Sequence, residues 1–122
     1  MSKTNPVAVG LIGCGNISSI YLQNAQTLDP IEIVACADMR REAAEAQAAK
    51  FGVGRVCSVE ELLADPKIEI VLNLTTPESH GTIALAAIEA GKSVYNEKPL
   101  AMSREQGTRM LQVARAKGRL VG

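Results

Sequence analysis

Hydrophobic and polar residues divide the chain into short apolar runs and longer mixed segments that follow one another in turn. The first apolar run, residues 7–12, does not alternate with polar residues, so it predicts a strand that is buried on both faces. The predicted strands are residues 7–12, 31–37, 55–57, 68–74, 92–96 and a last one opening at 119–122. The mixed segments predict helices over residues 16–28, 40–51, 78–90 and 103–117.

Residues that start or stop helices support these boundaries. Gly52, Gly91 and Gly118 each follow a predicted helix, and glycine is the usual residue at a helix end. Ser58, with Glu61 three places later, forms a capping-box pattern that opens a further short helix ending at Ala64.

The order of these elements predicts one α/β domain over residues 1–122. Strands that alternate with helices build right-handed β-α-β units, which place the strands parallel. We predict a Rossmann-type, doubly wound sheet with strand order 3-2-1-4-5-(6) and helices on both faces. The sequence stops where the sixth strand opens, which suggests a fragment of a longer protein.

Composition excludes several classes of protein. Lys and Arg number 13, as do Asp and Glu, so no basic surplus favours nucleic acid or an anionic membrane. No run of ~18 apolar residues predicts a membrane span, and no apolar leader predicts secretion. The three cysteines lack C-x-x-C spacing, so we predict no disulfide framework, no metal site and a reducing cytoplasm.

The turn after the first strand carries a dinucleotide-binding pattern. Gly13 and Gly15 stand one residue apart, between an apolar run and a helix. Such a turn brings bare backbone N–H groups up to a pyrophosphate, so we predict that Gly13, Gly15, Asn16 and Ile17 contact a cofactor. Ser18 replaces the third glycine of G-x-G-x-x-G, and a small residue there still permits close packing of the helix on the strand.

An acidic residue ends the second strand. The Asp38 carboxylate can accept hydrogen bonds from both hydroxyls of an adenosine ribose and would repel a 2′-phosphate, which favours NAD over NADP. Arg40 and Arg41 follow, and a guanidinium there could pair with a 2′-phosphate, so NADP stays open. The alternative interpretation makes Asp38 a turn residue and the arginines a solvated helix face.

Two more segments follow the carboxyl ends of predicted strands, where open α/β sheets bind ligands. Thr75, Thr76 and Pro77 either line the cofactor's path or form a turn with proline at the first helical position. His80, in the first turn of that helix, could carry a proton, although packing or capping is the more economical interpretation of a histidine without a visible partner.

The tripeptide Glu97-Lys98-Pro99 follows the fifth predicted strand. Lys98 could donate a proton or a hydrogen bond to a substrate hydroxyl or carbonyl oxygen, and burial would lower its pKa toward the working range. Glu97 could hold a ribose or orient the lysine. Considered alone, the tripeptide would be a charged turn.

Together these motifs resemble the Gfo/Idh/MocA family, over nearly the whole chain. The resemblance rests on residues 9–18, on Asp38, on Thr75-Thr76-Pro77 with His80, and on Glu97-Lys98-Pro99. It implies NAD(P)-dependent interconversion of a hydroxyl and a carbonyl on a sugar, cyclitol or similar molecule, with Lys98 catalytic. It also implies a second domain, outside this chain, that supplies most substrate contacts and a homo-oligomer interface. We expect this chain alone to bind the cofactor without efficient turnover.

Two alternatives from other classes stay open. A non-catalytic dinucleotide sensor would use the glycine turn and Asp38 but not Lys98. A methyltransferase would also use a glycine turn and an acid after the second strand, but the motif at Glu97-Lys98-Pro99 and the segment at 75–77 disfavour it.

Overall fold

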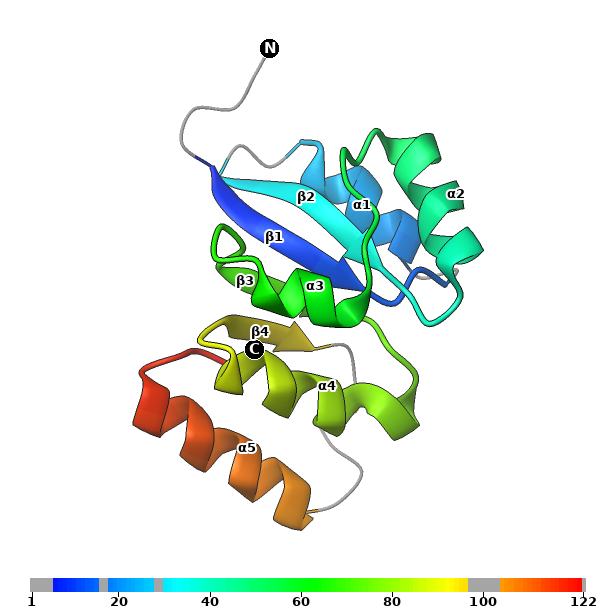
Figure 1. Cartoon of the computed structure of the whole chain (residues 1–122). Helices are drawn as coiled ribbons and strands as arrows, with labels where there is room; N and C mark the ends of the chain where they lie inside the picture. The colour runs from blue at the N-terminus through cyan, green and yellow to red at the C-terminus, as the bar shows by residue number, and fades with distance from the viewer. Residues whose placement is uncertain (1–5, 16–17, 28–29, 97–103, 122) are drawn as a thin grey trace.

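The computed structural model describes residues 6–15, 18–27, 30–96 and 104–121. Its strands form a parallel sheet that helices cover on both faces (Figure 1). The strands are β1 (Val7–Ile12), β2 (Ile31–Ala37), β3 (Ile70–Asn73) and β4 (Ser93–Asn96). The helices are α1 (Ser18–Ala25), α2 (Arg41–Phe51), α3 (Val59–Ala64), α4 (Pro77–Glu89) and α5 (Arg104–Lys117).

Among the described residues the sheet has four strands, in the order β2-β1-β3-β4, which matches the four central members of the predicted order. The two outer members of that order do not form strands in this part of the chain. The segment at 55–57 lies beside β2 but makes only an isolated bridge, between Val56 and Cys36. It cannot lengthen into a strand because Ser58 already caps α3. On the other edge, Val121 makes an isolated bridge to Val94 of β4. The two outer positions are therefore occupied, but by single bridges among the described residues.

The two faces of the sheet bury separate hydrophobic clusters. Val9 and Leu11 of β1 pack with Leu22 of α1 and with the α2 alanines. Ile12 faces the other way, into a cluster formed with α3, α4 and α5. A Cβ on Gly10 would lie 2.7 Å from Leu62 Cδ2, so the missing side chain at position 10 lets α3 pack closely against β1. This confirms the predicted helices on both faces.

Several element ends match the sequence prediction, and other elements are shorter than predicted. Gly52 ends α2 in the left-handed conformation, with φ of 71°. The helix predicted to run to residue 28 ends at Ala25, because Thr27 turns back and donates its backbone N–H to the Asn24 carbonyl. β3 begins at Ile70 rather than at 68, since the Ile68 N–H still closes a turn onto the Asp65 carbonyl.

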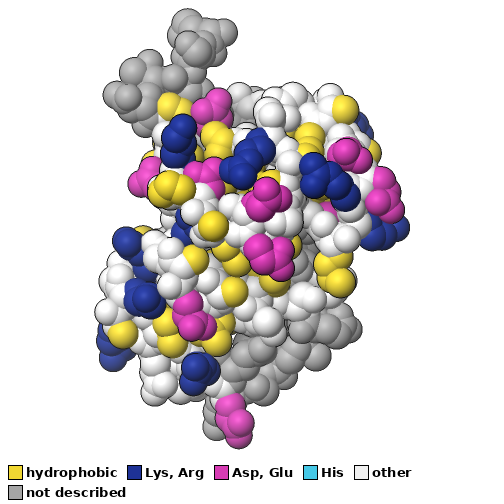
Figure 2. Space-filling view, in the orientation of Figure 1, with side chains coloured by type: hydrophobic (Ala, Val, Ile, Leu, Met, Phe, Trp, Pro, Cys, Tyr) yellow, Lys and Arg dark blue, Asp and Glu magenta, His cyan; other side chains and the backbone are white. Residues whose placement is uncertain are grey.

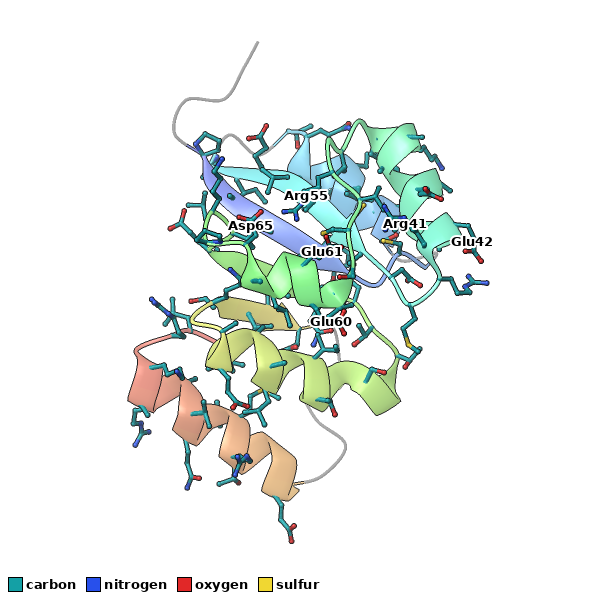
Figure 3. All side chains as sticks on the ribbon, viewed as in Figure 1. Arg41, Glu42, Arg55, Glu60, Glu61 and Asp65 are labelled. Atoms are coloured by element: carbon teal, nitrogen blue, oxygen red, sulfur yellow. The ribbon has the colours of Figure 1, made fainter. Side chains whose placement is uncertain are left out.

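Helix α3 is held by polar contacts at both ends. The predicted capping box is present: Ser58 Oγ accepts from the Glu61 N–H at 3.0 Å, and Glu61 Oε1 accepts from the Ser58 N–H at 3.0 Å. These bonds lower the pKa of the Glu61 carboxyl. After the helix, Asp65 pairs with Arg55 at 2.6 Å (Figure 3). These contacts fix the helix that brings Val59 to the pocket described below.

A buried lysine joins the amino ends of the strands, away from that pocket. Lys92 is only 4% exposed, and its Nζ donates to the Asp65 carbonyl at 2.6 Å and to the Ile68 carbonyl at 2.7 Å. Burial lowers the pKa of Lys92.

The surface carries charges of both signs. On the face shown in Figure 2, Lys and Arg side chains are interspersed with Asp and Glu, as the balanced composition predicts. Among the helices that the structure describes, none is both long and apolar enough to cross a membrane.

Candidate cofactor site

A pocket of about 260 Å³ lies where the carboxyl ends of β1, β2 and β3 meet. Six of its lining residues are predicted cofactor contacts: Gly13, Gly15, Asp38, Arg40, Thr75 and Thr76. The parallel sheet explains this meeting, since it brings the residues after each strand to one edge. The remaining lining residues are Ile12, Met39, Val59, Leu74, Ser79 and Ile83.

Glycine is present at positions 13 and 15 of the turn for different reasons. Gly13 has φ of 100°, and a Cβ on it would lie 2.5 Å from the Leu74 carbonyl oxygen. Glycine at 13 is therefore required by the fold itself, where the β3–α4 connection crosses the turn. A Cβ on Gly15 would meet no atom of the described residues within 4 Å, and Gly15 has no positive φ. The fold gives no reason for glycine at 15, whereas a ligand that approaches the backbone closely would give one.

Asp38 is held by the backbone around it. Its Oδ2 accepts from the Cys14 N–H at 2.7 Å, and its Oδ1 accepts from the Arg40 N–H at 2.8 Å. A carboxylate offers about four acceptor positions, so each oxygen keeps capacity for a further donor. The carboxylate is thus fixed between the glycine turn and α2, with capacity to accept from two hydroxyls.

Cys14 and Ser18 brace the turn rather than supply reactive groups. Cys14 is buried, and a hydrogen bond with Cys36, together with burial, raises the pKa of the Cys14 thiol. Ser18 is fully buried; its Oγ donates to the Gly15 carbonyl at 2.6 Å and accepts from Gln47 Nε2 at 2.7 Å. The residue in the third glycine position therefore ties the turn to α2.

The two arginines that follow β2 lie in different surroundings. Arg40 lines the pocket with an exposed side chain. Arg41 lies on the outer surface of α2, where its Nε is 3.8 Å from Glu45 Oε2 and its guanidinium donates to the Val56 carbonyl at 3.4 Å (Figure 3). Only Arg40 is placed to meet a group bound beside Asp38.

The β3–α4 connection forms the predicted start of a helix and also lines the pocket. α4 begins at Pro77, as predicted for a proline at the first helical position. Thr76 is the N-cap residue but makes no side-chain cap bond; its hydroxyl lies 3.5 Å from Ser79 Oγ. Thr75 and Thr76 both line the pocket.

Some predicted site residues cannot be placed. Asn16, Ile17, Glu97 and Lys98, with Pro99 of the same motif, lie outside the described residues. Pro77 and His80 lie in the first turn of α4, and their side chains fall outside the described part of the structure.

Sequence reasoning missed two features of the site. Met39, 93% exposed, follows Asp38 directly and lines the pocket. An apolar residue next to the acid that is predicted to bind a ribose could have indicated it. Asn73 is fully buried at the end of β3 and accepts a hydrogen bond from Thr75. A polar residue inside an apolar run could have indicated that Asn73 has a role in the site. Among the described side chains, no group of three potential metal ligands comes together.

Comparisons with known proteins agree with this geometry. A family model described as the oxidoreductase family GFO_IDH_MocA, NAD-binding Rossmann fold, matches residues 7–122. A 1,5-anhydro-D-fructose reductase from Ensifer adhaerens is 40% identical over 114 residues, or 93% of this chain and 34% of that protein. A myo-inositol 2-dehydrogenase from Thermotoga maritima is 30% identical over 105 residues, or 85% of this chain and 31% of that protein.

Solved structures give the same result. A 3-ketoreductase from Actinomadura kijaniata, in complex with NADP and TDP-benzene, superposes with a TM-score of 0.90 at 32% identity. The match covers 96% of this chain and 36% of that one. The chain thus spans about a third of the length of the relatives it matches. With the family model covering nearly all of its residues, the chain belongs to the Gfo/Idh/MocA oxidoreductase family and forms an NAD-binding domain with the Rossmann fold.

Proposed function

We propose that this domain binds the cofactor of an enzyme that interconverts a hydroxyl and a carbonyl on a sugar, cyclitol or similar small molecule. One observation carries the cofactor assignment: the space over Gly15 is open, while the Asp38 carboxylate is fixed at the edge of the same pocket. The substrate class is supported by relatives named as a 1,5-anhydro-D-fructose reductase and a myo-inositol 2-dehydrogenase.

Each part of the pocket suits one part of a dinucleotide. The Asp38 carboxylate would accept from the hydroxyls of the adenosine ribose. The turn at Gly15 would face the pyrophosphate, since the Gly13 and Cys14 N–H groups already donate to Ala37 and Asp38. The apolar side chains of Met39, Val59 and Ile83 suit the adenine base. NAD is favoured by Asp38, and the exposed Arg40 leaves NADP as the second candidate.

The chemistry would combine the cofactor with a lysine of this chain. When bound, the nicotinamide supplies a hydride acceptor or donor. Lys98 would move a proton to or from the substrate oxygen, with Glu97 holding a ribose or orienting the lysine. We propose that a further domain of the full-length enzyme contacts the substrate and forms a homo-oligomer, and that the enzyme works in the cytoplasm.

We expect the isolated 122-residue chain to bind NADH, because the turn and Asp38 lie in one pocket. Calorimetric titration with NADH, NADPH and S-adenosylmethionine tests this directly. Heat from NADH or NADPH and none from S-adenosylmethionine is the expected result. The reverse pattern would contradict the dehydrogenase assignment in favour of a methyltransferase.

Lys98→Met in the full-length enzyme is expected to lower kcat about 100-fold or more while cofactor affinity changes little, since positioned general acids and bases contribute roughly 10²–10⁴-fold. Steady-state kinetics and NADH titration of the same variant separate the two effects. Equal losses in turnover and affinity would assign Lys98 to cofactor binding. Unchanged turnover would show that Lys98 is not catalytic, whereas a full-length protein that turns over no sugar or cyclitol would favour the non-catalytic sensor.

A further inference from the structure

A buried amide lies beneath the pocket, at the carboxyl end of β3. Asn73 is fully buried and stands in a strand that is otherwise apolar. Burying an amide is costly unless its polar atoms are hydrogen-bonded. Asn73 Oδ1 lies 2.7 Å from Thr75 Oγ1 and 3.4 Å from Thr75 N, and Asn73 Nδ2 lies 2.8 Å from Asn96 Oδ1 at the end of β4.

The direction of these bonds follows from the backbone. The Thr75 N–H can only donate, so the Asn73 atom on that side must be its oxygen. Because that oxygen only accepts, the Thr75 hydroxyl must donate to it. The Asn73 amide nitrogen then faces β4 and donates to Asn96 Oδ1.

This network determines what Thr75 can offer to a ligand. A threonine hydroxyl has one proton, and in Thr75 the proton is already donated to Asn73, so the oxygen can only accept from a ligand. Thr75 lines the pocket, whereas Asn73 lies beneath it. Thr76 differs, because its hydroxyl lies 3.5 Å from another hydroxyl, that of Ser79, and either of these can donate.

The position of Thr75 in the sheet indicates which half of the cofactor it would meet. Asp38 follows β2, the glycine turn follows β1, and Thr75 follows β3, in the spatial order β2-β1-β3 (Figure 1). A dinucleotide with its adenosine ribose at Asp38 and its pyrophosphate at the turn extends toward β3 with its nicotinamide half.

We propose that Asn73 is a positioning residue, which fixes Thr75 Oγ1 as an acceptor for a hydrogen-bond donor on the nicotinamide half of the cofactor. The donor is either a ribose hydroxyl or the carboxamide N–H. This proposal rests on the proposed function, because it needs a dinucleotide in the pocket.

Calorimetric titration of the 122-residue chain with NAD tests the proposal on Asn73→Leu, Thr75→Val and the double variant. Each single variant is expected to weaken NAD binding roughly tenfold, the size of one lost hydrogen bond in a desolvated site. The double variant should bind no more weakly than Thr75→Val alone, because Asn73 acts through the Thr75 hydroxyl. Independent, multiplying losses would overturn the proposal.

Two controls separate positioning from a general loss of structure. Lys92→Met removes a buried polar group at the opposite edge of the sheet, and NAD affinity should be unchanged whatever stability it loses. ADP lacks the nicotinamide half, so Asn73→Leu should bind ADP as the unmodified chain does. A loss with ADP equal to the loss with NAD would overturn the proposal.

Further ligands identify the donor. If the carboxamide donates, the loss in Asn73→Leu disappears with the 3-acetylpyridine analogue of NAD, which lacks that N–H. If the ribose donates, the loss persists with both the analogue and ADP-ribose. Either result supports a hydrogen bond from the nicotinamide half of the cofactor to Thr75 Oγ1.

The remaining outcomes are equally decisive. Should Asn73→Leu fail to fold, Thr75→Val and Thr75→Ser decide: weakened binding in the first and normal binding in the second support the proposal, and normal binding in both overturns it. If the unmodified chain binds no NAD, the proposed function falls and this inference with it. If it binds NAD and Asn73→Leu binds equally well, only this inference falls.

Discussion

Asp38→Ala is expected to weaken NAD binding to this domain about 100-fold or more, while NADP binding changes less or improves. The carboxylate would accept two ribose hydroxyl bonds, and bonds to a charged group contribute about 1.5–3 kcal/mol each. For NADP, removing the negative charge also removes its repulsion of the 2′-phosphate. Calorimetric titration with both cofactors at one ionic strength measures the two effects.

The comparison between cofactors is needed because Asp38 also supports the turn. Its Oδ2 accepts from the Cys14 N–H, so the alanine variant disturbs the backbone that would face the pyrophosphate. That disturbance weakens NAD and NADP alike, whereas loss of the ribose contact weakens NAD more than NADP. Equal losses for the two cofactors would therefore contradict the ribose assignment.

Arg40→Ala is the matched control for this experiment. It removes the guanidinium but keeps the backbone N–H that donates to Asp38 Oδ1. We expect NAD affinity to be retained and NADP affinity to fall, since a guanidinium can pair with a 2′-phosphate.

The central strands could be predicted from sequence because their limits are local. β1 and β2 have the predicted bounds, since each is a mostly apolar run, broken in β2 by Glu32, that ends before a residue suited to leaving the sheet, Gly13 or Asp38. The segment at 55–57 has only two apolar residues, and its extent depends on the capping box that follows and on its neighbour β2. Edge pairing of this kind is decided by tertiary contacts rather than by pattern.

In the candidate site, too, some residues could be predicted from local sequence and others depend on tertiary contacts. Gly13, Asp38 and Thr75 follow strands that the pattern identifies, so a parallel sheet brings them to one edge. The role of Asn73 could not be predicted, because its partner Asn96 is distant in sequence and is reached only through the pairing of β3 with β4.

The motif also could not show which glycine serves the fold. Gly13 and Gly15 are equivalent in the pattern, yet only Gly13 is close to the β3–α4 backbone. Substituting each in turn separates folding from binding.

Gly13→Ala is expected to lower the free energy of unfolding by about 2–4 kcal/mol. An alanine at φ of 100° is strained, and its Cβ would lie 2.5 Å from the Leu74 carbonyl oxygen, a backbone atom that cannot move aside without shifting the chain. Urea unfolding followed by circular dichroism measures the change. A loss below about 0.5 kcal/mol, the usual size of a surface substitution, would show that the β3–α4 connection relaxes freely.

Gly15→Ala is expected to do the opposite: to leave the free energy of unfolding within about 0.5 kcal/mol and to weaken NADH binding about tenfold or more. Among the described residues its Cβ would meet no atom within 4 Å, so we expect the fold to tolerate it. The same Cβ would occupy space where the pyrophosphate must approach the backbone N–H groups. Unfolding and NADH titration of one preparation test both halves. Normal affinity in Gly15→Ala would move the pyrophosphate away from this turn, because the open space over Gly15 is the observation that placed it there.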